Sequence, residues 1–175
     1  MNALGSKVLG RVATKSLRAT FLAIDRRVGH CIEMVRNGEF QTVLVSQEGN
    51  DSEQWPASPA LQSVHVEKHN EDDVAFLVGM AGRNHWSASV KADSKLDRIV
   101  FEIACRIASE PLWLGSTYRM DDSLPNASPA ELPVRIDAIA PLNFAANGTE
   151  LAISIPFGNG ALPRTVAWSY SVKSY

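Results

Sequence analysis

Residues 97–108 read DRIVFEIACRIA, and the alternation of their side chains decides the fold class. Every second position from 99 to 107 is apolar, and the positions between them mix apolar, charged and small residues. A strand sends successive side chains to opposite faces of a sheet, so the pattern predicts a strand with one face on a core. A helix would gather only some of the apolar residues on one side. The apolar set is Ile99, Phe101, Ile103, Cys105 and Ile107.

The same period of two recurs elsewhere along the chain, over 74–80, 86–90, 134–138, 151–155 and 165–172. Asn37-Gly38 separates two further segments, and Asn-Gly supplies the positive φ angles of a tight hairpin turn. With the segments near 65–69 and 113–120, about ten antiparallel strands are expected. The prediction is an all-β fold, an antiparallel β-sandwich with a β-barrel as the alternative.

The first 18 residues are set apart by their charge. We divide the chain into a basic N-terminal extension, 1–18, and a single antiparallel β domain, 19–175. The four basic residues of the extension are spaced four, four and three, which would place them on one face of a short helix. A basic amphipathic helix can lie on an anionic membrane or in a partner's groove. The alternatives are a helix or strand docked on the acidic body and a disordered start. The four residues are Lys7, Arg11, Lys15 and Arg18.

Composition excludes several classes of partner and environment. The net charge is −2, and taking the four basic residues of 1–18 from the total of 17 leaves 13 against 19 acidic ones, so 19–175 carries −6. An acidic body lacks the clustered basic face that a phosphate backbone requires, so no nucleic-acid partner is expected. Only Cys31 and Cys105 are present, which indicates a reducing, cytoplasmic location. No apolar run is long enough for a transmembrane segment.

Sequence motifs favour binding over catalysis. The chain has no P-loop, no H-E-x-x-H, no C-x-x-C and no G-x-S-x-G, so no cofactor is expected and an enzyme is the less favoured interpretation. His65, Glu67 and His69 alternate along a predicted strand and would project to one face. Two imidazoles and a carboxylate suit zinc or non-haem iron, although neighbours on one strand rarely converge on one ion. A metal ion held by these residues is the basis of one alternative interpretation, a metal-dependent enzyme.

Aromatic and charged residues near 113–122 suggest a ligand site. Trp113 and Tyr118 offer flat apolar surfaces, and neighbouring charged groups could bond the rim of a sugar or another flat ligand. The alternative is that the tryptophans fill the core or the space between sheets. A second candidate surface is the polar strand face formed by His85, Ser87, Ser89 and Lys91, which suits either solvent or a ligand. The predicted ligand-binding set is Trp113, Tyr118, Arg119, Asp121 and Asp122.

Three functional hypotheses follow. The first is a non-enzymatic module that binds a small molecule, a glycan or another protein. The second is a structural homo-oligomer, because Val100, Ala104 and Ala108 would give the longest strand a small apolar outer face onto which a second layer could pack. The third is the metal-dependent enzyme built around His65, Glu67 and His69.

Overall fold

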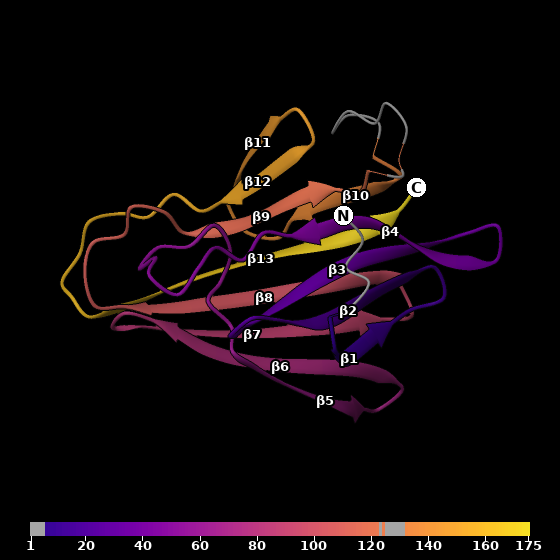
Figure 1. Cartoon of the computed structure of the whole chain (residues 1–175), viewed down its shortest axis with the longest axis horizontal. Helices are drawn as coiled ribbons and strands as arrows, with labels where there is room; N and C mark the ends of the chain where they lie inside the picture. Colours follow the sequence, from indigo (N-terminus) through magenta and orange to yellow (C-terminus); the bar gives the residue numbers. More distant parts are fainter. Residues whose placement is uncertain (1–5, 123, 125–131) are drawn as a thin grey trace.

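The computed structural model describes residues 6–122, 124 and 132–175 (Figure 1). In these residues thirteen strands form two antiparallel sheets that pack face to face. Each sheet has two free edges, so the sandwich is confirmed and the barrel alternative is wrong. The described ranges contain no helix, hence none with the length and hydropathy of a membrane span.

Sheet A has seven strands in the order β1-β2-β3-β4-β9-β12-β11. Its first four strands are joined in order by hairpins. β9 pairs with β4 through Leu44↔Met120, Val45↔Arg119 and Ser46↔Tyr118. The bounds are β1 Val8–Ala13, β2 Leu17–Ile24, β3 Arg27–Arg36, β4 Glu39–Ser46, β9 Gly115–Met120, β12 Glu150–Ser154 and β11 Asn143–Asn147.

Sheet B has six strands in the order β10-β13-β8-β7-β6-β5. The chain crosses from sheet A to sheet B three times, after β4, after β9 and after β12, by way of 47–62, 121–133 and 155–163. The bounds are β10 Val134–Ala138, β13 Arg164–Ser174, β8 Arg98–Ile107, β7 Asn84–Asp93, β6 Asp72–Ala81 and β5 Ser63–His69.

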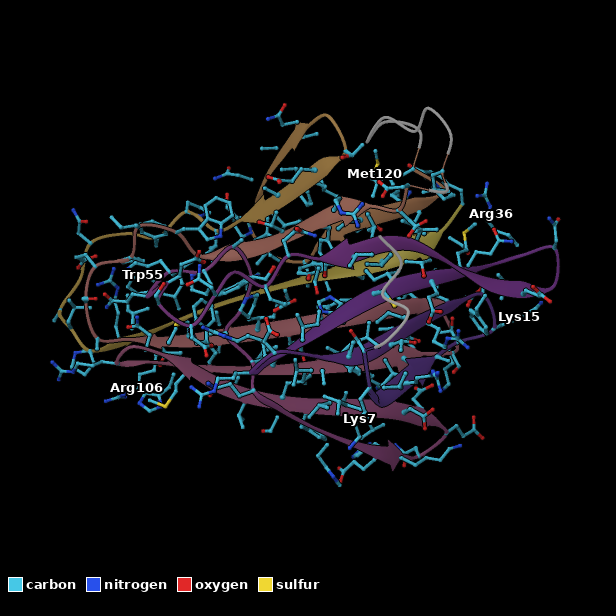
Figure 2. All side chains as sticks on the ribbon, viewed as in Figure 1. Lys7, Lys15, Arg36, Trp55, Arg106 and Met120 are labelled. Carbon is cyan, nitrogen blue, oxygen red and sulfur yellow. The ribbon has the colours of Figure 1, made fainter. Side chains whose placement is uncertain are left out.

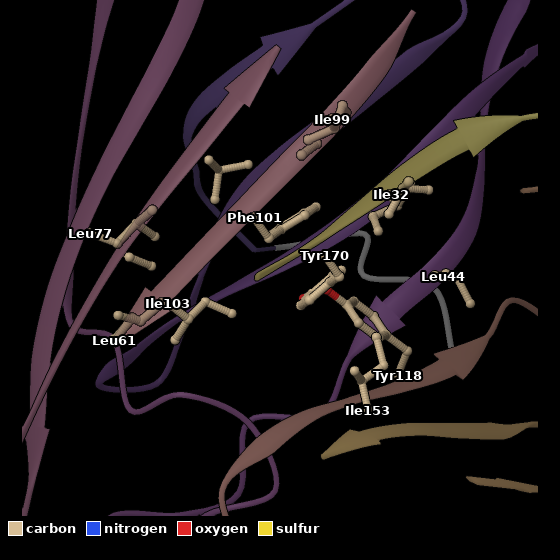
Figure 3. Close-up of a cluster of buried hydrophobic side chains, with 14 of the residues drawn as sticks. Ile32, Leu44, Leu61, Leu77, Ile99, Phe101, Ile103, Tyr118, Ile153 and Tyr170 are labelled. Carbon is tan, nitrogen blue, oxygen red and sulfur yellow. The ribbon is translucent and has the colours of Figure 1, made fainter. Parts of the chain in front are cut away.

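The core lies between the sheets, and the stretch 97–108 is central to it. All five apolar residues of its alternating set are at most 4% exposed. Figure 3 shows Ile99, Phe101 and Ile103 along β8, turned toward residues of sheet A. The ring of Phe101 stacks on Tyr170 at a centroid distance of 4.9 Å. The predicted core-facing strand is therefore confirmed.

The Asn37-Gly38 hairpin is also confirmed. The two residues have φ angles of 54° and 83° and join β3 to β4. These are the left-handed conformations that a two-residue turn of this kind requires.

The possible N-terminal helix is wrong, because β1 and β2 form a hairpin there. Figure 2 shows Lys7 and Lys15 well apart, beyond the two ends of β1. Gly10, which disfavours a helix, is needed in the strand: a Cβ at this position would lie 2.6 Å from Val66 Cγ2 of β5. Val12 and Leu17 are fully buried, so core packing outweighs the helical spacing of the charges.

Candidate functional site

The outer face of sheet B carries a ridge of large apolar side chains. Along β6, Phe76, Val78 and Met80 are 44%, 56% and 43% exposed, whereas Ala75 and Leu77, on the opposite face of the strand, are buried in the core. Contiguous apolar surface of this kind is uncommon on a soluble protein and marks interaction sites. We call these three side chains the β6 ridge.

Small side chains lie beside the ridge. Residues directly opposite one another in a sheet share a face. Ser89 lies opposite Phe76, and Ser87 opposite Val78. On β8 and β13 the same face carries alanine and serine side chains. These are shorter than the ridge side chains and form a lower floor beside them. The floor consists of Ser87, Ser89, Ala104, Ala167 and Ser169.

Three hollows follow this floor in the strand direction. The first, about 470 Å³, contains Phe76, and the second, about 530 Å³, contains Val78 and Met80. They adjoin because both are lined by Ser87 and Ala104. The third, about 360 Å³, adjoins the second. Both are lined by Met80, His85 and Arg106. We call the three hollows together the sheet B groove. From Phe76 to Met80 alone it runs roughly 14 Å, at about 3.4 Å per residue.

Charge differs between the two ends of the groove. Glu102 lies in the first hollow and accepts a hydrogen bond of 2.8 Å from Ser89 Oγ through its Oε2 atom. Arg106 lies in the second and third hollows, with His85 beside it on β7. Figure 2 shows Arg106 toward one end of the sandwich. An elongated ligand would therefore meet a carboxylate near one end and a guanidinium near the other.

The structure does not bring the predicted ligand-binding residues onto one platform. Tyr118 is fully buried between the sheets. Trp113 precedes β9, and its Nε1 donates to Ala57 O at 3.1 Å, so its ring packs against the segment after β4. Arg119 Nη1 lies 2.8 Å from Asp122 Oδ1 in an exposed pair, and Asp121 is half-buried beside it.

His65, Glu67 and His69 lie on the edge strand β5. His65 lies opposite Phe76, and its Nε2 is 3.7 Å from Glu67 Oε2. The described part of the chain contains no group of three or more His, Cys, Asp or Glu side chains placed to hold a metal ion. The metal site stays a prediction. Because His65 lies opposite Phe76, it is on the same sheet face as the β6 ridge.

A hydrogen-bonded chain of polar side chains crosses the core. His30 Nε2 of β3 lies 2.9 Å from Tyr118 OH of β9, which lies 2.6 Å from Tyr170 OH of β13 (Figure 3 shows the two tyrosines). Phe21 and Phe101 flank the imidazole, with ring centroids 6.2 and 5.4 Å away. Burial lowers the pKa of His30 to about 4 and raises that of Tyr170 to about 12. The chain ties sheet A to sheet B with neutral groups.

Glu48 borders the same interior. It is 7% exposed, and burial raises its pKa to about 7, against the opposing effects of the Ser46 hydrogen bond and the Arg27 charge. Ser46 Oγ donates to Glu48 and accepts from the His30 backbone N–H at 2.8 Å. The cavity lined by Glu48, His30 and Tyr170 has only about 20 Å³ open to the centre of a water molecule. That is room for about one water, so the interior cluster is structural and the groove is the functional candidate.

Comparisons with family models, curated proteins and solved structures found no match to this chain. The site is therefore argued from this chain alone. The sequence predicted the polar face of β7 but not that Phe76 and Glu102 lie beside it on the same sheet face. The available signal was that both alternating sets of β6 are apolar, and in a two-layer sandwich only one face of a sheet packs on the core.

Proposed function

We propose that this chain is a non-enzymatic binding module whose ligand is a neutral oligosaccharide lying along the sheet B groove. The observation that carries the proposal is the exposed β6 ridge beside a floor of serine and alanine. A sugar ring has an apolar face of C–H groups and a rim of hydroxyls. The ridge suits the first, and the serine hydroxyls with Glu102 suit the second.

The size and charge of the groove support this class of ligand. The first two hollows, at about 470 and 530 Å³, fall within the range of about 300–1,000 Å³ typical of small-ligand sites. Glu102 keeps one carboxylate oxygen beyond its bond to Ser89, and a carboxylate can accept bonds from neighbouring sugar hydroxyls. Cytoplasmic residence belongs to the same proposal and rests on Cys31 and Cys105, which are both buried free thiols.

Truncating the ridge should weaken binding. We expect Phe76→Ala to raise the dissociation constant for the bound oligosaccharide about tenfold or more, because the ring lines the first hollow and is 44% exposed, so a sugar can pack on it. Glu102→Gln should raise it by about tenfold through loss of charge-assisted hydrogen bonds. A neutral glycan array, including cello-, malto- and manno-oligosaccharides, selects the ligand, and titration calorimetry measures the affinities.

Matched controls separate binding from folding. Leu96→Ala removes an exposed apolar side chain from the β7–β8 turn, outside the groove, and Glu39→Gln neutralises an exposed carboxylate at the β3–β4 turn. Both should bind like the wild type. The proposal fails if no neutral oligosaccharide binds, or if the Phe76 and Glu102 variants bind as tightly as these controls.

A further inference from the structure

Within the described residues the two sheets have four edge strands, and three of them carry features that discourage pairing with another chain. β1 has a bulge between Val8 and Gly10. β5 ends in charged and imidazole side chains over 65–69. On β10, Asp137 pairs with Arg135 at 2.8 Å and with Lys173 at 3.1 Å. Bulges and charges are the usual means by which edge strands avoid association.

The fourth edge, β11, has none of these features. Its sequence, Asn143-Phe-Ala-Ala-Asn147, is uncharged and without proline, and all five residues are exposed. Its register with β12 is continuous from Asn143↔Ser154 to Asn147↔Glu150. Figure 1 shows the β11–β12 hairpin at the margin of the molecule, away from β5 to β8. A flat, uncharged edge is a template for another strand.

The hairpin geometry identifies which backbone groups of β11 are not bonded to β12, and no other backbone group of the described residues bonds to them. Only Gly148 and Thr149 separate Asn147 from Glu150, so Asn147 and Glu150 form the closing hydrogen-bonded pair of a two-residue turn. Hydrogen-bonded pairs alternate along an antiparallel ladder. The N–H and C=O groups of Phe144 and Ala146 therefore point away from β12, toward the open edge.

We propose that two copies of this chain pair antiparallel through β11, about a two-fold axis at Ala145, and so join their seven-stranded sheets into one. A two-fold axis between antiparallel strands is perpendicular to the sheet, so each side chain stays on its own face and the central residue meets its copy. The register places Phe144 opposite the partner's Ala146 and Asn143 opposite the partner's Asn147. In this register the backbone N–H and C=O groups of Phe144 bond to those of the partner's Ala146. The two-fold axis repeats this hydrogen-bonded pair on its other side.

Phe144 gives this pairing an apolar contact. Its side chain is 45% exposed although it lies on the same face as Ile153, which is fully buried. In the proposed register the two Phe144 rings are diagonal neighbours on one face, roughly 7–8 Å apart at their backbones and within reach of each other. The interface is one short strand pair, so the dimer should form in a concentration-dependent way.

A charge swap at Ala145 tests the register. The mass of the wild type in sedimentation equilibrium should rise with concentration toward twice the chain mass of 19.1 kDa. Ala145→Lys and Ala145→Asp each place like charges opposite each other, which should raise the dimer dissociation constant by about fivefold or more. An equal mixture of the two variants pairs opposite charges and should restore the dimer. Phe144→Ala should weaken it without any charge.

Ala138→Lys and Ala138→Asp are the controls, because Ala138 is an exposed alanine on the other edge strand β10. They should associate like the wild type. The proposal is overturned by a wild type that stays monomeric at every concentration, by Ala145 variants that dimerise undiminished, or by a mixture that recovers no dimer. The groove lies on sheet B, so loss of the dimer would leave oligosaccharide binding unchanged and the two proposals fail separately.

Discussion

Glu48→Gln should be more stable than the wild type by about 3 kcal/mol near pH 8, and equal to it near pH 4. Burial raises the pKa of Glu48 from 4.5 to about 7 in the folded protein. Below pH 4.5 the carboxyl is neutral in both the folded and the unfolded chain, so its titration costs nothing. Between pH 4.5 and 7 the unfolded chain ionises while the folded chain keeps its proton, so the wild type loses about 1.4 kcal/mol of stability per pH unit, and above pH 7 the loss is constant. Glutamine removes that loss and can still accept the Ser46 hydrogen bond.

His30 acts in the opposite direction. Its folded pKa of about 4 lies below the ordinary value of 6.5, so the stability that it contributes is complete above pH 6.5 and is lost as the pH falls toward 4. Between pH 4.5 and 6.5 the effects of Glu48 and His30 on the free energy of unfolding nearly cancel. Glu48→Gln should therefore reveal the His30 contribution, as a steeper rise of stability with pH than the wild type shows.

Urea unfolding at a series of pH values measures both effects. The decisive quantity is the difference in free energy of unfolding between variant and wild type, which should grow from pH 4.5 to 7 and then level off. Glu39→Gln, at an exposed turn, should show no such growth. Parallel curves for Glu48→Gln and the wild type would mean that Glu48 titrates normally in the folded protein.

Arg18→Met should cost about 3 kcal/mol, because it leaves a buried carboxylate without its cation. Arg18 Nε and Nη2 lie 2.6 and 2.7 Å from the two oxygens of Glu33, which is 9% exposed. Burial alone would raise the pKa of Glu33, but hydrogen bonds from Arg18 and Thr20 hold it below the ordinary value. Methionine keeps an apolar stem near Phe40, over whose ring the guanidinium lies at 4.1 Å.

The double variant Arg18→Met, Glu33→Gln distinguishes a stranded charge from lost packing. Glutamine still accepts the hydrogen bond from Thr20 and carries no charge, so the double variant should recover much of the stability that Arg18→Met loses. Thermal and urea unfolding at neutral pH give the comparison. A double variant no more stable than Arg18→Met would show that packing against Phe40, and not charge pairing, accounts for the loss.

The fold class could be predicted because several strands bury one face only. On β8, residues that alternate with the Ile99 set are partly or fully exposed, so the period of two is visible in the sequence. β2 was missed since it is buried on both faces from Ala19 to Leu22 and shows no alternation. β11 was missed for the opposite reason: all its residues are exposed, and nothing apolar repeats.

The candidate site was harder to predict than the fold. On β6 both faces are apolar, so only the packing of sheet B on sheet A reveals that Leu77 enters the core and Phe76 does not. Glu102 reaches the groove through its pairing with Ser89 and Ser169, and such cross-strand neighbours are invisible without the strand order. Tyr118 illustrates the converse, because a residue typical of ligand sites is here a hydrogen-bonded part of the core.

The position of β13 between β8 and β10 has a consequence for how the chain folds. β5 to β8 are joined by consecutive hairpins and can assemble as they leave the ribosome. The other edge of β8 stays unpaired until β13 is made, because β13 pairs with it from Arg98↔Lys173 to Ile107↔Arg164. Contacts between such distant segments make folding slow, and an unpaired strand edge is prone to aggregate meanwhile. We expect nascent chains halted before residue 164 to need chaperone protection that longer chains do not.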